Sequence, residues 1–194
     1  MKPALGLAVT AGVATLATIG WLGYRLIEQN RLPGNGIPSG LISSPQQLSP
    51  AQEQAQADAI MGLTLPDLDG RPQAIAQWRD KVLVVNYWAS WCAPCVEEIP
   101  AFSRLQRQYA AQGVQFVGIG IDHPENMQAF VKATPVAYPL LVADPAASQM
   151  PGLQIKGLPY TLVIGPDGRV QGSRLGRLDE SRLNSILQRL ASPR

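Results

Sequence analysis

The chain has 194 residues and a formal net charge of +2, with 16 lysines and arginines against 14 aspartates and glutamates. This length accommodates one ordinary domain and additional segments, but not two full domains. Hydrophobic residues make up 46% of the chain, which suffices for a packed core. Lysine and arginine form no run, and nucleic-acid binding requires clustered positive charge, so the composition argues against a nucleic-acid partner.

The first segment of the chain is apolar. No charged residue occurs from Ala4 to Tyr24, and about 20 apolar residues suffice to cross a bilayer as a helix. We therefore expect residues 1–28 to form an N-terminal transmembrane helix that acts as an uncleaved signal-anchor. The alternative is a cleaved signal peptide, which would carry an Ala-x-Ala-like site after this stretch. Both alternatives predict that the rest of the chain is exported.

The next segment, residues 29–60, is rich in Pro, Gly, Ser and Gln and is expected to be a flexible linker. Within it, Ser49 and Pro50 favour the start of a short helix over residues 51–59. The folded domain is expected over residues 61–194.

Hydrophobic periodicity predicts the elements of this domain. Strands are expected at residues 65–70, 81–87, 114–121, 160–164 and 169–175, and helices at residues 95–112, 124–133 and 183–190. The first half alternates strand and helix, which favours parallel strands, and the second half contains a hairpin. The predicted fold class is therefore α/β, with a central mixed β-sheet flanked by helices.

Cys92 and Cys95 are the only cysteines, and they follow a buried strand at the start of a helix. A disulfide that closes so short a loop stabilises a fold by about 2 kcal/mol through chain entropy, which favours a chemical role. The unpaired N–H groups and the dipole of a helix N-terminus stabilise a thiolate. The pattern predicts a redox-active disulfide in which Cys92 attacks and Cys95 resolves. The alternatives are an inert bridge and a zinc site, but zinc needs four ligands and the chain has one histidine.

Residues 87–100 (YWASWCAPCVEEIP), together with residues 157–161 (GLPYT), resemble the active site of the TlpA/ResA/DsbE-like family of membrane-anchored thioredoxin-fold thiol–disulfide oxidoreductases. The resemblance implies a thioredoxin-like fold, no cofactor, no metal, and a catalytic domain on the periplasmic or extracytoplasmic side of the inner (cytoplasmic) membrane. It also implies reduction of disulfides in client proteins, such as apocytochrome c or copper-oxidase assembly proteins. A transmembrane partner of the DsbD or CcdA type would supply the electrons.

The resemblance also implies roles for residues near the cysteines. Glu98 matches a glutamate that serves as proton shuttle or pKa tuner for the resolving thiol, and Asn86 stands where cytoplasmic thioredoxins carry a buried aspartate. Pro159 matches the cis-proline of the family, which leaves the backbone of Leu158 free to pair with a client peptide.

Further residues of this segment are expected to shape the site. Pro94 restricts the backbone between the cysteines. Trp91 and Trp88 are candidates either for the contact surface or for the core, with Trp91 favoured for the surface. Tyr160 follows Pro159 where the DsbE subgroup carries an acidic residue, and His123 is expected to be an exposed loop residue.

Two other functions are compatible with a reactive cysteine pair. A thiol peroxidase of the peroxiredoxin type shares the fold, but its Pro-x-x-x-Thr-x-x-Cys context is missing around Cys92. A Cu(I) metallochaperone would bind copper through the two thiolates, which are soft ligands.

Overall fold

The structure is a computed structural model, and it describes residues 48–145 and 150–191. The expected signal-anchor (residues 1–28) and most of the expected linker (residues 29–60) lie outside the described residues. Within the described part of the chain, no helix has the length and apolar character needed to cross a membrane.

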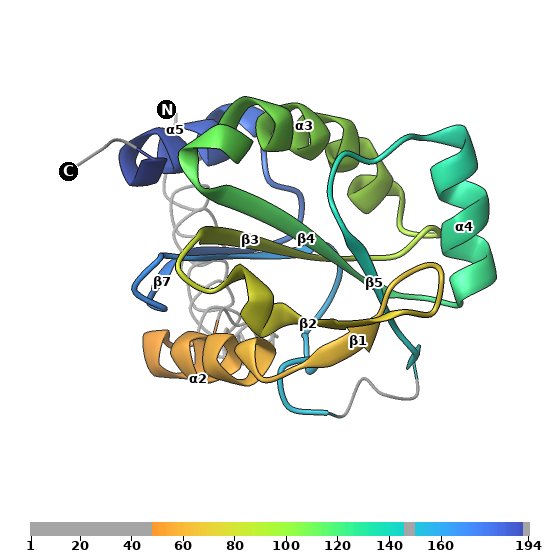
Figure 1. Ribbon diagram of the computed structural model, residues 1–194, viewed down its shortest axis with the longest axis horizontal. Helices are drawn as coiled ribbons and strands as arrows, with labels where there is room; N and C mark the ends of the chain where they lie inside the picture. The colour runs from red at the N-terminus through yellow and green to blue at the C-terminus, as the bar shows by residue number, and fades with distance from the viewer. Residues whose placement is uncertain (1–47, 146–149, 192–194) are drawn as a thin grey trace, which may run out of the picture. The chain divides into compact units, whose positions relative to one another are not determined.

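A five-stranded mixed sheet forms the centre of the domain (Figure 1). Its strand order is β5-β4-β3-β6-β7. The sheet contains β3 (Val82–Trp88), β4 (Val114–Ile121), β5 (Leu140–Ala143), β6 (Tyr160–Ile164) and β7 (Val170–Leu175). β3 is parallel to β4, and β4 to β5, whereas β6 is antiparallel to both β3 and β7. The predicted α/β class and mixed sheet are confirmed.

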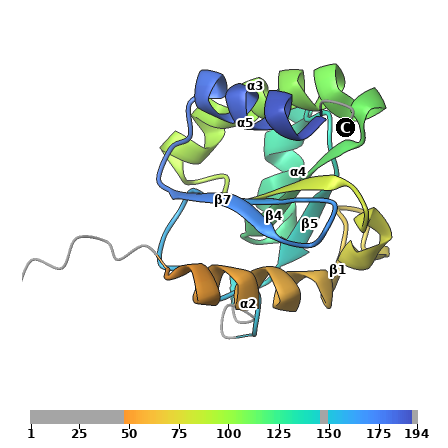
Figure 2. The same ribbon diagram turned by 90° about the vertical axis from the view of Figure 1, so that its left-hand side faces the viewer.

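Strand β3 lies at the centre of this sheet and is buried on both faces. Its side chains alternate, as they must in an extended strand. Val84 and Trp88 belong to the core that includes residues of helices α3 (Ala93–Tyr109), α4 (Pro124–Ala133) and α5 (Glu180–Ala191). Leu83, Val85 and Tyr87 belong to the core on the opposite face, which α2 (Pro50–Met61) covers. Figure 2 shows the sheet between these two layers.

Helix α2 occupies residues that were expected to belong to the linker. Ser49 caps it by the expected mechanism, because its hydroxyl accepts from the N–H of Gln52 while the Gln52 side chain accepts from the N–H of Ser49. Ala57 and Ile60 are buried in the core. Helix α2 is therefore packed onto the domain by these two side chains.

The same helix covers the outer edge of β7. The amide oxygen of Gln54 accepts from the N–H of Val170 at 3.0 Å, and its amide nitrogen donates to the carbonyl of Gly168 at 2.9 Å. One side chain therefore occupies two backbone groups where the edge of β7 begins.

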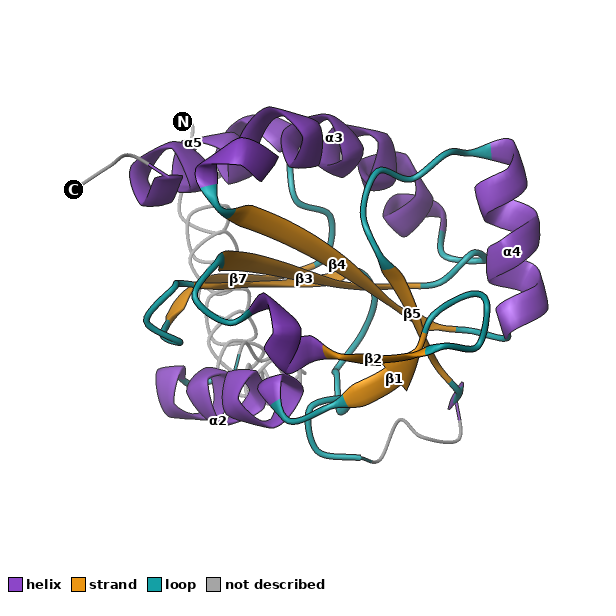
Figure 3. Cartoon of the chain, viewed as in Figure 1, coloured by secondary structure: helices purple, strands orange, loops and turns teal. Residues whose placement is uncertain are grey.

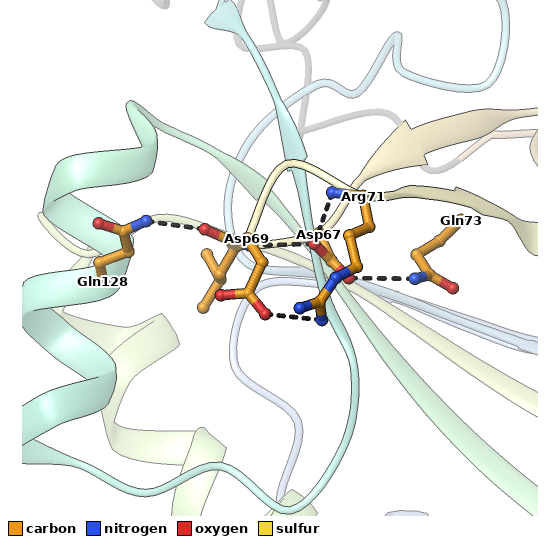
Figure 4. Close-up of polar contacts among 6 residues, drawn as sticks. Asp67, Asp69, Arg71, Gln73 and Gln128 are labelled. Atoms are coloured by element: carbon orange, nitrogen blue, oxygen red, sulfur yellow. Dashed lines mark hydrogen bonds and ion pairs between the residues drawn. The ribbon is translucent and has the colours of Figure 1, made fainter.

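A hairpin of β1 (Thr64–Pro66) and β2 (Pro72–Ala74) covers the other edge of the sheet. Where a longer strand was expected over residues 65–70, a turn follows Pro66, because the carboxylate of Asp67 accepts from the N–H groups of Asp69 and Arg71 at 2.9 Å each. These hydrogen bonds, led by that from Arg71, hold the pKa of Asp67 below its ordinary value. The side chain of Gln128 in α4 donates to the carbonyl of Leu68 (Figure 4).

Several short elements were not predicted from the sequence. Strand β5 has four residues, and strand β2 of the hairpin has three. The 3₁₀ helices η1 (Ile75–Trp78) and η2 (Ala110–Gln112) precede β3 and follow α3.

Candidate active site

Strand β3 leads through a short loop into α3, the longest helix of the described residues (Figure 3). The cysteine pair lies at the start of this helix. Cys92 is the N-cap residue of α3, and Cys95 lies in its first turn. The two form a disulfide, with Cα atoms 5.3 Å apart. The exposed fraction of Cys92 is 6%, and that of Cys95 is 0%. Both residues are therefore largely covered in the oxidised state, and Cys92 is the one that reagents can reach.

The start of α3 favours a negative charge on Cys92. Its backbone carbonyl already accepts from Cys95 and Val96, at 3.0 and 3.1 Å, which closes the first turn. An N-cap side chain lies at the positive end of the helix dipole, next to N–H groups without helical partners. Pro94 fits the first turn because its missing N–H is not needed there and its φ angle is fixed. A thiolate formed at Cys92 on reduction is thus stabilised by the helix itself.

Pro159 lies next to the cysteine loop through strand pairing. Tyr160 at the start of β6 is in register with Tyr87 near the end of β3, so Pro159 is level with Trp88. The Leu158–Pro159 bond is cis, and the carbonyl of Pro159 accepts from the N–H of Gly176 at 2.8 Å. The expected cis-proline therefore lies beside the end of β3 from which the cysteine loop continues.

Glu98 is a buried carboxyl group one helical turn beyond Cys95 and is 2% exposed. Its Oε1 accepts from the side-chain amide of Asn86 at 2.8 Å, and its Oε2 accepts from the N–H of Leu178 at 3.0 Å. Burial raises the pKa of Glu98 to about 7, although these two hydrogen bonds and the positive charge of Arg177 act in the opposite direction. A carboxyl group with this pKa exchanges protons readily near neutral pH.

Asn86 holds Glu98 in a network that joins three parts of the fold. The amide nitrogen of Asn86 also donates to the hydroxyl of Thr161 on β6, at 3.1 Å. Asn86 is 1% exposed and lies on the face of β3 that carries Val84 and Trp88, so its amide reaches Glu98 of α3. Tyr138 is close enough that the charge of Glu98 adds to the effect of burial, and both raise its pKa.

The neighbouring Glu97 lies on the surface and is a solvated charge. Its carboxylate forms an ion pair with Arg177 at 3.0 Å, and both side chains are more than half exposed. Exposed pairs of this kind contribute little to stability.

The two tryptophans have different environments. Trp88 is fully buried and packs against Phe130 of α4, with ring centroids 5.1 Å apart. Trp91 is 69% exposed directly beside Cys92. Trp88 is therefore a core residue, and Trp91 offers an aromatic surface next to the reactive sulfur.

Asp122, directly after β4, was not predicted from the sequence. It is 2% exposed, and its Oδ2 accepts from both the N–H and the hydroxyl of Ser90, at 2.9 and 2.6 Å. Burial alone would raise the pKa of Asp122, but hydrogen bonds from Asn126, Ser90 and His123 lower it below its ordinary value. An acid directly after a parallel strand that adjoins β3 was the available signal. His123 is exposed at the N-cap of α4, as expected.

Comparison with known proteins agrees with this geometry. The thiol–disulfide oxidoreductase ResA of Geobacillus thermodenitrificans is 26% identical over 125 residues, which cover 64% of this chain and 71% of the relative. ResA of Halalkalibacterium halodurans is 26% identical over 144 residues, covering 74% and 78%. The crystal structure of a putative thiol:disulfide interchange protein DsbE from Chlorobium tepidum superposes with a TM-score of 0.61 at 26% identity, covering 67% of this chain and 93% of that one.

The AhpC/TSA family matches residues 57–173, which include both cysteines, Glu98 and the cis-proline. These relatives and the Cys92–Cys95 disulfide at the start of α3 agree on the chemistry. The chain therefore belongs to the AhpC/TSA family, and its relatives ResA and DsbE together with the Cys92–Cys95 pair identify it as a thiol–disulfide oxidoreductase.

Proposed function

We propose that this oxidoreductase works as a reductase of disulfides in client proteins outside the cytoplasm. The observation that carries the proposal is the pairing of an N-cap cysteine with a buried carboxyl group whose pKa is about 7. The first feature supplies a thiolate, and the second supplies a proton acceptor for the resolving thiol.

The reaction transfers two electrons from the cysteine pair to the client. The Cys92 thiolate attacks one sulfur of the client disulfide, forms a mixed disulfide, and releases the other client sulfur as a thiolate. Cys95 then loses its proton, and its thiolate attacks the Cys92 sulfur. The Cys92–Cys95 disulfide forms, the mixed disulfide breaks, and the second client sulfur leaves as a thiolate that is protonated from the site or from water.

Glu98 is the group proposed to accept the proton of Cys95. Cys95 is fully buried, so water does not reach its thiol freely. Glu98 lies three residues further along the same helix, on its buried side. Hydrogen bonds from Asn86 and Leu178 occupy both carboxylate oxygens in the oxidised state, which fixes the carboxyl group in place. Its pKa of about 7 lets it accept a proton and release it within one turnover.

We further propose that residues 1–28 anchor the protein in the inner membrane, with residues 29–47 as a tether and the domain on the periplasmic side. The apolar stretch from Ala4 to Tyr24 supports this location. A transmembrane donor of the DsbD or CcdA type would return two electrons to the oxidised pair. Clients would be apocytochrome c or copper-oxidase assembly proteins.

Alkaline extraction of membranes from cells that express the full chain, or the chain without residues 1–28, tests the anchor. Release of the full chain would contradict it.

Reduction of insulin by the purified protein tests the chemistry. Cys92→Ser should abolish the activity, and undiminished turnover in that variant would refute the mechanism. Cys95→Ser should leave the client attached to Cys92, so mass spectrometry of the trapped adducts from cells names the clients. The same preparation tests the other two functions, through peroxide consumption and through anaerobic Cu(I) titration of the reduced protein.

A further inference from the structure

The carboxylate of Asp122 connects the cysteine loop to helix α4. Its Oδ2 accepts two hydrogen bonds from Ser90, as described above. Its Oδ1 accepts from the N–H of His123 at 2.8 Å and from the side-chain amide of Asn126 at 2.9 Å. Both oxygens of a nearly fully buried side chain are thus used, and every partner is a donor.

The two hydrogen bonds from Ser90 hold the loop between β3 and α3 two residues before Cys92. Ser90 lies two residues before Cys92, between the end of β3 and the start of α3. Inside the loop, the N–H of Cys92 donates to the carbonyl of Ala89 at 3.2 Å. Ser90 is bound by a residue 32 positions away, directly after the neighbouring strand. The contact between Ser90 and Asp122 therefore ties the loop to the end of the neighbouring strand.

We propose that Asp122 is a positioning residue for Cys92, acting through Ser90. This rests on the thiol–disulfide exchange proposed above, in which Cys92 must approach a client sulfur and, later, the sulfur of Cys95. Holding reacting atoms in place contributes strongly to such reactions, and a misplacement of 1 Å costs roughly a hundredfold in rate. Asp122 itself touches neither the client nor the sulfurs in this role.

The chemistry of the contact requires a carboxylate. In Asp122→Asn, one of the two oxygens becomes an NH₂ group. In either orientation this group faces a backbone N–H, that of Ser90 or that of His123, which can only donate, so one of these two hydrogen bonds is lost. In Ser90→Ala the carboxylate stays and only the hydroxyl is removed. Ser90→Thr keeps the hydroxyl and serves as the conservative variant.

The test compares these variants in two assays on the purified full-length protein. The first is the rate constant for insulin reduction at the high-pH plateau, where the thiolate of Cys92 is fully formed. The second is the equilibrium constant of the Cys92–Cys95 pair with glutathione, which does not involve a client. We expect Ser90→Ala and Asp122→Asn to lower the plateau rate about tenfold each and to make the disulfide several-fold easier to reduce. Ser90→Thr should stay within about twofold of the wild type.

A double variant, Ser90→Ala with Asp122→Asn, should be no slower than Asp122→Asn alone, because both changes break one contact. Two controls separate positioning from general destabilisation. Ile75→Val shortens a buried side chain in the core on the opposite face of the sheet, and Asp69→Asn is the same isosteric change on an exposed turn. Both should leave the two assays unchanged.

Unchanged plateau rates and unchanged glutathione constants in Ser90→Ala and Asp122→Asn would overturn the proposal, as would fully multiplicative effects in the double variant. If Asp122→Asn does not fold, Ser90→Ala and Ser90→Thr decide the question alone. If the wild type fails to reduce insulin, the proposed reductase function is wrong, and the glutathione constants still decide whether Asp122 positions Cys92.

Discussion

Replacing Glu98 by Gln tests whether this buried carboxyl group titrates near neutral pH. The pKa of Glu98 is about 7 in the folded protein and ordinarily 4.5, mainly because burial disfavours the charged form. The folded state therefore binds this proton more tightly than the unfolded chain does. Its contribution to stability is fully present below about pH 4.5 and is lost as the pH rises through about 7.

The size of the effect follows from the two pKa values. They lie about 2.5 pH units apart, and each unit corresponds to about 1.4 kcal/mol, so wild-type stability should fall by ~3 kcal/mol across this range because of Glu98. In Glu98→Gln this pH dependence disappears. The variant also loses one of two hydrogen bonds, because Asn86 and Leu178 both donate and a glutamine side chain offers a single oxygen. That loss is a constant offset and does not depend on pH.

Urea unfolding of the oxidised protein at a series of pH values from 4.5 to 8 measures the effect. The difference in the free energy of unfolding between wild type and variant cancels the groups that both share. As the pH rises from 4.5 to about 7.5, we expect the free energy of unfolding of the wild type to fall by ~3 kcal/mol relative to that of Glu98→Gln. Glu97→Gln is the matched control, because Glu97 is the preceding residue and its side chain is 58% exposed. Its difference should stay within about 0.5 kcal/mol at all pH values. A flat difference for Glu98→Gln would refute the reasoning.

Three further substitutions test other parts of the site. In Asn86→Asp, a second carboxyl group replaces the donor that lies 2.8 Å from Glu98. The pair cannot ionise fully, so infrared titration should show two steps, the second above pH 7, and a single step near the ordinary pKa would contradict this. Trp91→Ala should change stability by less than about 0.5 kcal/mol, because the side chain is exposed, yet raise the KM for insulin; an unchanged KM would remove Trp91 from the contact surface. In Gly120→Ala the new Cβ would overlap the buried side chain of Met127, so thermal unfolding should show a loss of roughly 1–3 kcal/mol, and unchanged stability would show that Met127 can move aside.

Local signals predicted much of the domain. Strand β4 (Val114–Ile121), helix α4 (Pro124–Ala133) and strand β6 (Tyr160–Ile164) have the predicted bounds, because each is a strongly apolar or periodic run between turn residues. Strand β5 (Leu140–Ala143) was missed. Its four residues are all buried, so they show no alternation. Helix α2 was predicted from its cap, but its packing depends on contacts that its own sequence does not reveal.

The candidate site was predictable where its residues lie close in sequence or, like Pro159, belong to a segment that resembles the family. Cys92, Cys95 and Glu98 lie within seven residues, inside the segment that resembles the family and that implied the role of Glu98. The hydrogen bond from Leu178 to Glu98 spans 80 positions, and that from Ser90 to Asp122 spans 32. Such contacts follow from how the strands pair and how the chain returns after β7, which a single sequence does not specify.

The treatment of the two sheet edges bears on how this domain behaves at high concentration. An exposed edge is a template on which another chain can add a strand, and repeated addition leads to fibres. Here the side chain of Gln54 occupies backbone groups at the start of β7, and on the far side Asp67 bridges Leu141 of β5. Both contacts reduce the free edge with which a strand of another chain could pair.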